Sequence, residues 1–283
     1  MSNKTILDNI KKLRDITGVG FADCKLAIVE NNGDIEKSVE YLRKKGIAKA
    51  SKKMSRVAAE GLVLINKKEE NLSVIEINSE TDFVAKNNEF ISFCKEISEI
   101  NLKVQSNLKS LNSSKMSNGK NVEENLINLI SKIGEKITIR RAKYFNNKGK
   151  NFSYIHNSLE KNIGKVAAII QLSNNSKKDL TELGNKLAMH VAAQSPLAVD
   201  ETDIKKETLD KELEIIKEEL KNSGKKENMI DKISQGKLNK FISDNTLLNQ
   251  IWIMDTKKKV KDILGKEIKV VDFVRFKVGE GIE

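Results

Sequence analysis

The segment 81–87 brings an acid, an aromatic ring and a lysine together, in the order Thr81, Asp82, Phe83, Val84, Ala85, Lys86, Asn87. A β-branched apolar run at 72–77 predicts a strand before it. A helix is predicted after it, from Asn88, by the i, i+3, i+4, i+7 spacing of Phe90, Phe93, Cys94 and Ile97 on one buried face. Phe83 belongs to neither pattern. A large ring in a connection either folds back into the core or is held out for a partner. The residues alone leave both alternatives open.

The sequence contains no constellation of catalytic or metal-binding residues. The two histidines, His156 and His190, have no cysteine or carboxylate at metal-ligand spacing, and His190 lies in an apolar helical pattern typical of a buried core histidine. Cys24 and Cys94 also lie in amphipathic helical patterns, which favours buried thiols over a disulfide or a metal site. No Gly-x-x-x-x-Gly-Lys-Ser/Thr loop occurs. We therefore expect no covalent chemistry, no cofactor, no metal and no direct binding of nucleotide.

The composition is that of a globular protein large enough for a hydrophobic core. The chain has 283 residues, of which 39% are apolar, enough for one large or two small domains. No apolar run approaches the roughly 18 residues of a membrane span, and residues 1–8 lack the apolar core of a secretory signal. We expect a cytoplasmic protein that makes no membrane contact.

The formal charge of +11 raises the question of a nucleic-acid partner. Of 51 basic residues, however, the arginines are Arg14, Arg43, Arg56, Arg140, Arg141 and Arg275. Phosphate and base recognition favours the bidentate guanidinium of arginine, whereas evenly spread lysine is typical of a solvated surface. Nucleic acid is therefore not the expected partner, although a basic RNA- or ribosome-associated binding protein remains the alternative class.

The N-terminal part of the chain reads as a compact helical module. Residues 4–46 contain three runs with apolar residues three or four positions apart. The third run begins at Asp34, a favourable N-cap, and is expected to end before Gly46. We predict a three-helix domain at 1–47, followed by a short, basic, solvated linker at 48–56.

The remaining chain shows the same order of elements twice, in predicted subdomains 57–146 and 147–283. The predicted strands are 61–65, 72–77, 137–145, 152–155, 165–172 and 268–278, and the predicted helices between them are 88–100 and 179–193. Each half reads β-β-α-β, with antiparallel strands covered by helices on one face. The fold class is therefore α+β.

Two segments interrupt this order. Residues 103–122 are rich in Asn, Ser and Lys, and we predict that they form a mobile loop that does not pack. Within 203–242, apolar residues from Leu209 to Leu220 alternate by four and three positions, a break follows at 223–226, and a second apolar face comes next. That pattern predicts an antiparallel helical hairpin, a short coiled coil, projecting from the second half.

Thr-Asp-Phe-Val-Ala-Lys-Asn at 81–87 closely resembles the signature of the bacterial elongation factor Ts family, the guanine-nucleotide exchange factors of elongation factor Tu. Further resemblance follows in family order at 15–25 (Asp-Ile-Thr-Gly-Val-Gly-Phe-Ala-Asp-Cys-Lys), 32–36 (Asn-Gly-Asp-Ile-Glu), 133–141 (Ile-Gly-Glu-Lys-Ile-Thr-Ile-Arg-Arg), 187–193 (Leu-Ala-Met-His-Val-Ala-Ala) and 276–283 (Phe-Lys-Val-Gly-Glu-Gly-Ile-Glu). Six matches in one order across the chain make the resemblance specific.

The resemblance implies a ubiquitin-associated-like (UBA-like) N-terminal domain, paired core subdomains and a coiled coil that serves dimer contacts in some members and partner contacts in others. A homodimer through the hairpin is therefore one expectation. Arg14 and Phe21 match family positions that touch the nucleotide-binding domain of elongation factor Tu, although Phe21 could instead cap the core of its own module. Phe21-Ala22 departs from the Met-Met of some relatives. His156 matches a histidine near the surface that grips the far domain of elongation factor Tu, but an ordinary strand histidine fits the pattern nearly as well.

The resemblance also implies a mechanism without covalent chemistry. In the family, the segment that matches Asp82 and Phe83 enters a cleft of elongation factor Tu carrying GDP, shifts a peptide near the β-phosphate and disturbs the Mg²⁺ that bridges nucleotide and protein. Phe83 would then be the wedge and Asp82 would position it. Thr81 and Val84 would shape the turn.

Overall fold

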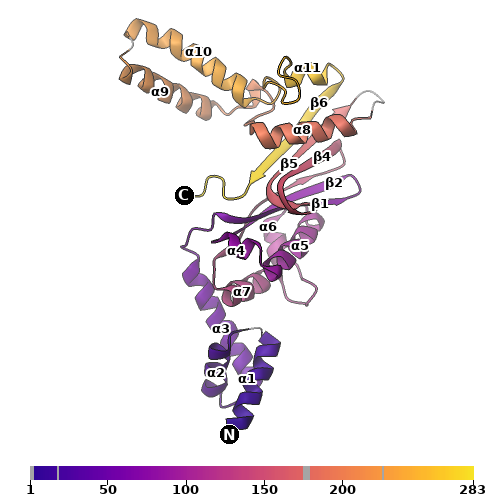
Figure 1. Cartoon of the computed structure of the whole chain (residues 1–283), viewed down its shortest axis with the longest axis vertical. Helices are drawn as coiled ribbons and strands as arrows, with labels where there is room; N and C mark the ends of the chain where they lie inside the picture. Colours follow the sequence, from indigo (N-terminus) through magenta and orange to yellow (C-terminus); the bar gives the residue numbers. More distant parts are fainter. Residues whose placement is uncertain (1–2, 18, 175–178, 225) are drawn as a thin grey trace.

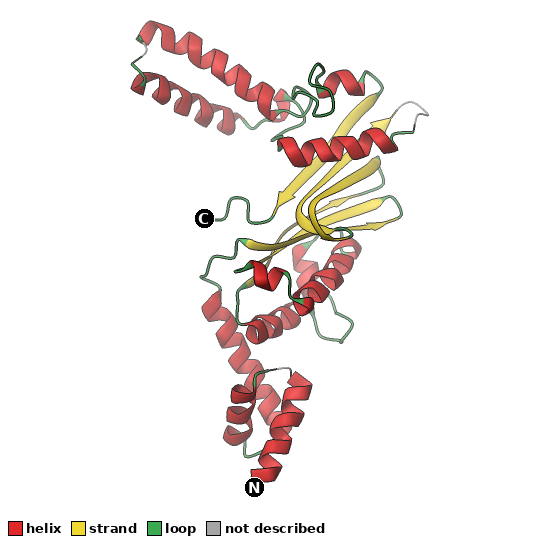
Figure 2. Cartoon of the chain, viewed as in Figure 1, coloured by secondary structure: helices red, strands yellow, loops and turns green. Residues whose placement is uncertain are grey.

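A computed structural model describes residues 3–17, 19–174, 179–224 and 226–283. Gly18 and Lys225, which belong to the predicted loop and hairpin break, lie outside these ranges. The molecule is elongated, with three N-terminal helices at one end, a twisted sheet in the middle and a pair of long helices at the other end (Figure 1). Figure 2 shows helices packed beside a sheet, and the strands of that sheet pair antiparallel, so the α+β prediction is confirmed.

The N-terminal module consists of α1 (Asn3–Thr17), α2 (Phe21–Glu30) and α3 (Ile35–Lys53). The helices share a small core made of Ile10, Leu13, Cys24, Ala27, Ile28 and Leu42. The side chain of Asp34 accepts a hydrogen bond from the backbone N–H of Lys37 at 3.0 Å, so the predicted N-cap is confirmed. Three apolar helix faces therefore close on one another, as their spacing indicated.

Helix α3 is longer than predicted, and the expected end before Gly46 is wrong. The helix runs through Gly46 and through most of the predicted linker, and ends at Lys53. Ala50 is buried in the core of the first body half, and the Nζ atom of Lys53 donates a hydrogen bond to the carbonyl of Gly134. Because packing on one side compensates for a sequence with few apolar residues, the helix continues where a solvated linker was expected.

The strands form one six-stranded antiparallel sheet. They are β1 (Glu60–Lys68), β2 (Asn71–Ser79), β3 (Ile137–Phe145), β4 (Lys150–Glu160), β5 (Ile163–Asn174) and β6 (Ile268–Lys277). The order is β3-β2-β1-β5-β4, and β6 also pairs with β5. The sets β3-β2-β1 and β4-β5-β6 are thus built alike, and the pairs Val63–Gly164 and Leu64–Ile163 join them.

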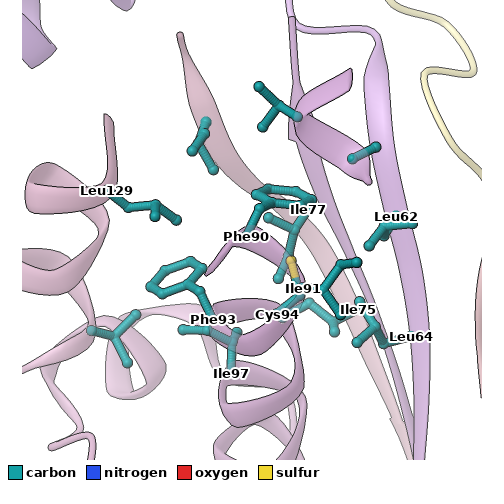
Figure 3. Packing of buried hydrophobic residues seen from close by; sticks show 14 of the residues in the cluster. Leu62, Leu64, Ile75, Ile77, Phe90, Ile91, Phe93, Cys94, Ile97 and Leu129 are labelled. Carbon is teal, nitrogen blue, oxygen red and sulfur yellow. The ribbon is translucent and has the colours of Figure 1, made fainter. Parts of the chain in front are cut away.

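Helices cover one face of the first half. Helix α5 (Asn88–Lys103) packs on β1 and β2, and α7 (Val122–Ile133) closes the same core. The side chains predicted to form the buried face of α5 are Phe90, Phe93, Cys94 and Ile97; all four are buried, and Figure 3 shows them meeting Leu62, Leu64, Ile75 and Ile77 of the strands. The prediction for this helix face is confirmed.

The prediction of an unpacked loop at 103–122 is wrong. The segment contains a short helix, α6 (Leu108–Ser113), and its apolar side chains Leu111 and Met116 lie in the core of the first half. The side chain of Asn107 caps α6, and Asn121 and Glu124 form a capping box at the start of α7. Two well-placed apolar residues and local caps therefore order a segment whose composition is mostly polar.

In the second half, α8 (Thr181–Gln194) lies across β4 and β5 (Figure 1). His190 is fully buried in this helix, as predicted. Its Nε2 atom lies 3.0 Å from Oε1 of Gln250, and its ring stacks on Trp252 with centroids 5.2 Å apart. Burial lowers the pKa of His190 and so favours the uncharged ring.

The predicted hairpin is present as α9 (Lys206–Asn222) and α10 (Glu227–Asn245), which project from the body (Figure 1). The two helices bury Ile216, Leu220, Ile230 and Leu238 against each other. A 3₁₀ turn, Glu201–Asp203, precedes the hairpin, and α11 (Val260–Leu264) follows it. Among the described residues, no helix is long and apolar enough to cross a membrane.

A buried carboxylate ties the last strand to the first half. Glu76 on β2 is fully buried and accepts hydrogen bonds from Nη1 of Arg140 at 3.0 Å, from Nε of Arg141 and from the backbone N–H of Gly279 at 2.9 Å. Burial alone would raise the pKa of Glu76, but the bonds from Gly279 and Arg141 outweigh it and lower the pKa. Gly279 has φ +75°, and a Cβ there would lie 2.1 Å from the carbonyl oxygen of Ala59, so this approach requires glycine.

Candidate functional site

The segment singled out by the sequence forms a one-turn helix, α4 (Asp82–Ala85), between β2 and α5 (Figure 1). Thr81 is its N-cap, with φ −124° and ψ 158°, and its hydroxyl accepts a hydrogen bond from the backbone N–H of Val84 at 3.4 Å. The turn closes where the N–H of Asn87 donates to the carbonyl of Val84 at 2.9 Å. The side chain of Asn87 then caps α5 by accepting from the N–H of Glu89 at 2.8 Å.

Neighbouring side chains in this turn have opposite environments. Val84 is 6% exposed and Ala85 is 1% exposed, both inside the core of the first half, whereas Phe83 is 80% exposed. No other large apolar side chain among the described residues reaches that exposure. Phe83 therefore does not fold back into the core, and of the two alternatives the outward-facing ring holds. A ring in this position is available for contact with another molecule.

Asp82 lies at the surface of the same turn. Its Oδ2 atom accepts a hydrogen bond from Nζ of Lys86 at 2.7 Å, and that bond lowers the pKa of Asp82. Within the described ranges, no group of three or more His, Cys, Asp or Glu side chains could hold a metal ion. The turn itself presents an exposed apolar ring beside a surface carboxylate.

The turn also receives support from a segment that sequence reasoning missed. Glu135, between α7 and β3, accepts one hydrogen bond from the backbone N–H of Thr81 at 3.0 Å and another from its hydroxyl at 2.8 Å. The neighbouring Glu80 accepts from the backbone N–H of Lys136 at 2.5 Å and pairs with Arg56 at 3.2 Å. The one available signal was the occurrence of Glu135 in a segment that resembles the family.

Arg14 and Phe21 both belong to the N-terminal module, which lies away from α4 (Figure 1). Arg14 is exposed in the last turn of α1, and Phe21 is the first residue of α2 with 47% of its surface exposed. Phe21 does not belong to the buried core of the module. The capping role that was open for Phe21 is therefore at most partial, and half of the ring faces solvent.

His156 lies on β4, at the far side of the sheet from β3. Its side chain is exposed, and its Nδ1 atom lies 3.3 Å from the hydroxyl of Tyr154. The structure thus brings Thr81, Asp82, Phe83 and Val84 into one turn, and it places Arg14, Phe21 and His156 on two other parts of the molecule.

Comparison with known proteins shows the family to which this chain belongs. The model of the family described as "Elongation factor TS" matches residues 80–280. Elongation factor Ts of Rickettsia akari (strain Hartford) is 38% identical over 284 residues, which cover 97% of this chain and 92% of the relative. This chain belongs to the elongation factor Ts family. Elongation factors Ts of Gluconobacter oxydans (strain 621H), at 38% identity, and of Methylobacterium nodulans, at 40%, cover the same shares of both chains.

Family membership makes the chain a translation elongation factor. The family model begins at Glu80, so the Phe83 turn and His156 fall within the matched region, whereas Arg14 and Phe21 precede it. The exposed ring of Phe83 therefore lies within the residues that the family model matches, and these relatives cover 97% of the chain.

Proposed function

We propose that this chain binds elongation factor Tu carrying GDP and accelerates release of the GDP, so that GTP can replace it. Membership of the elongation factor Ts family supports the choice of partner and activity. The observation that carries the proposal is the exposure of Phe83 at 80%, on a turn whose next two residues are buried. A hydrophobic ring held out on a rigid base is what a wedge between two parts of another protein requires.

The proposed mechanism needs no covalent step from this chain. Phe83 enters a cleft of elongation factor Tu, and Val84 holds the base of the turn in the core while Asp82 directs the ring. Displaced side chains in that cleft shift a peptide near the β-phosphate and disturb the Mg²⁺ that bridges nucleotide and protein. Since this ion is the largest local charge on the phosphates, weakening its coordination weakens the binding of GDP.

The proposal has a thermodynamic consequence. If this chain weakens the binding of GDP to elongation factor Tu, then GDP must weaken the binding of this chain by the same factor. A rising concentration of nucleotide, mostly GTP, therefore displaces this chain from elongation factor Tu. The chain changes the rate of exchange and leaves the overall equilibrium between the two nucleotides unchanged.

We propose secondary contacts as well, and family membership supports the choice of partner. We place Arg14 and Phe21 against the nucleotide-binding domain of elongation factor Tu, since both are exposed at one end of the module. His156, exposed on the opposite half of the sheet, would contact the far domain. The hairpin of α9 and α10 is available either for a homodimer or for the partner.

The deciding experiment follows release of fluorescent GDP from purified elongation factor Tu by stopped flow. We expect the wild-type chain to accelerate release and Phe83→Ala to lose most of that acceleration. Val271→Ala is the matched control, because Val271 is another exposed large apolar residue, on β6, with 50% exposure. Equal acceleration by wild type and Phe83→Ala would reject the wedge.

A wild-type chain that failed to accelerate release would favour the basic RNA- or ribosome-associated class instead. The formal charge of +11 is the observation behind that alternative. Binding to RNA through phosphates falls steeply as salt rises and is competed by unrelated RNA. Titration of labelled RNA with the chain at two salt concentrations separates the two functions.

A further inference from the structure

Glu135 lies in the connection between α7 and β3, and both of its carboxylate oxygens bind one residue, Thr81. Oε2 accepts the backbone N–H of Thr81 at 3.0 Å, and Oε1 accepts its hydroxyl at 2.8 Å. The two residues are 54 positions apart in the chain. Hydrogen bonds to an ionised acceptor are stronger than neutral ones, so this contact strongly restrains Thr81.

Thr81 is the residue that determines where the Phe83 turn begins. Its hydroxyl hydrogen is used toward Glu135, which leaves the oxygen lone pairs directed to the backbone N–H of Val84. The hydrogen-bond chain therefore runs from Glu135 through Thr81 to Val84, the residue directly after Phe83. The direction of each bond is set by the carboxylate, because a carboxylate can only accept.

Glu135 is itself held on both sides. Gly134 ends α7 in a left-handed conformation with φ +87°, and its carbonyl accepts from Nζ of Lys53. On the other side, the Nζ atom of Lys136 donates to the carbonyl of Arg56 at 2.8 Å. The carboxylate that restrains Thr81 thus projects from a connection fixed to the end of α3.

We propose that Glu135 is a positioning residue that fixes Thr81 and thereby holds the Phe83 ring in the pose that enters the partner. The inference rests on the proposed exchange function. A ring that is already ordered loses less conformational freedom on binding than a ring on a loose turn. Pre-ordering therefore raises the affinity of this chain for elongation factor Tu and the rate at which GDP is released from that partner. Glu135 does not touch the partner in this scheme; it acts through Thr81.

Two substitutions at this position separate positioning from a mere change of charge. Glu135→Ala removes both hydrogen bonds, and we expect the acceleration of GDP release to fall by roughly fivefold to tenfold. Glu135→Gln keeps an oxygen for the N–H of Thr81 and offers an amide N–H to its hydroxyl, so it should restore most of the activity. Glu123→Ala, an exposed position on α7, is the control and should behave as wild type.

A double substitution tests whether Glu135 acts through the ring. In the Phe83→Ala background, Glu135→Ala should reduce the remaining acceleration by less than about twofold, because the ring that it positions is gone. A general loss of stability would instead give the same fivefold to tenfold reduction in both backgrounds. That additive result would overturn the positioning role.

Amide hydrogen exchange on the isolated chain tests the contact without elongation factor Tu. We expect Glu135→Ala to raise the exchange rate of peptides covering residues 80–87, and Glu135→Gln to raise it less, while peptides from α8 stay unchanged. Unchanged protection at 80–87 in Glu135→Ala would reject the positioning role even if exchange activity exists. If the wild-type chain does not accelerate release of GDP from elongation factor Tu, the proposed function is wrong. The hydrogen-exchange result still decides whether Glu135 orders the turn.

Discussion

Phe83 and Phe21 are both exposed aromatic residues near the start of a helix, yet their supports differ. Phe83 follows a threonine cap that is held by Glu135, and it precedes two buried residues. Phe21 follows Gly20, which makes no side-chain cap hydrogen bond, and Phe21 is outside the core of its module. Exposure alone is therefore a poor guide to function, because the two rings differ in how firmly the chain presents them.

This difference ranks the two predicted contact sites. A ring on an anchored turn can displace side chains of a partner, because the turn does not yield. A ring at an uncapped helix start can instead adjust its position, and it contributes mainly contact area. We therefore expect Phe83 to control the rate of nucleotide release and Phe21 to contribute mainly to affinity. Substitutions at and near the two rings test that ranking.

The largest effect is expected from removing the base beneath the turn. Phe90 is fully buried in the core that also holds Val84 and Ala85, and Phe90→Ala should lower the free energy of unfolding by about 3–5 kcal/mol. Urea unfolding measures this change. Phe83→Ala is the matched control and should stay within about 0.5 kcal/mol of wild type, since its ring packs little in the free chain. Similar losses in the two variants would mean that Phe83 is a core residue.

The next effect concerns binding. Phe83→Ala should weaken the complex with nucleotide-free elongation factor Tu by more than about 2 kcal/mol, as expected for a buried aromatic anchor at an interface. Titration calorimetry with the purified partner measures the affinity. An affinity equal to that of the Val271→Ala control would show that Phe83 does not contribute to the interface. Phe83 could then not rank above Phe21.

A smaller effect is expected at the N-terminal module. Phe21→Ala should cost about 1 kcal/mol of affinity, or roughly fivefold, with little change in the maximal rate of GDP release, because the ring is half exposed and loosely supported. The rate at saturating exchange factor and the affinity are measured in the same stopped-flow series. A maximal rate that fell as far as in Phe83→Ala would reverse the ranking.

The smallest effect comes from supplying the cap that α2 lacks. Gly20 has φ −60° and ψ 151°, and nothing lies within 4 Å of a Cβ added there, so Gly20→Ser fits the backbone. The serine hydroxyl should stabilise the start of α2 by a few tenths of a kcal/mol, roughly the difference between serine and glycine caps. Hydrogen exchange of the α2 amides should slow slightly. Faster exchange would show that the residue strains the loop.

Local patterns in the sequence were sufficient for the helices and strands whose faces are apolar. The i, i+3, i+4, i+7 spacing from Phe90 predicted the buried face of α5, and the seam from Leu209 predicted the hairpin. Both signals depend on residues close together in the chain. The same logic identified Phe83, because the ring broke the patterns on either side.

Features that depend on distant residues were not predictable in this way. Helix α3 passes Gly46 because Ala50 packs against the first half, and Leu111 orders a polar segment by entering the same core. The contact between Glu135 and Thr81 joins residues that are 54 positions apart, and no local sequence pattern predicts it. The energy of these contacts comes from packing and hydrogen bonds that exist only once the chain has folded.

The continuous helix α3 has a consequence for binding at two places. Its 19 residues span about 28 Å as a single rod from the N-terminal module into the body, where it also pairs with α7 through Arg43 and Glu124. Once the Phe83 turn binds a partner, α3 holds the N-terminal module at one fixed distance from that partner. Contact between the module and the partner is then an intramolecular step. A rigid helix gives the module a high effective concentration at one distance, whereas a flexible linker would spread that concentration over many distances. The avidity of the whole chain is therefore a matter of matched spacing, and a partner with a different separation between its two surfaces would gain nothing from the second contact.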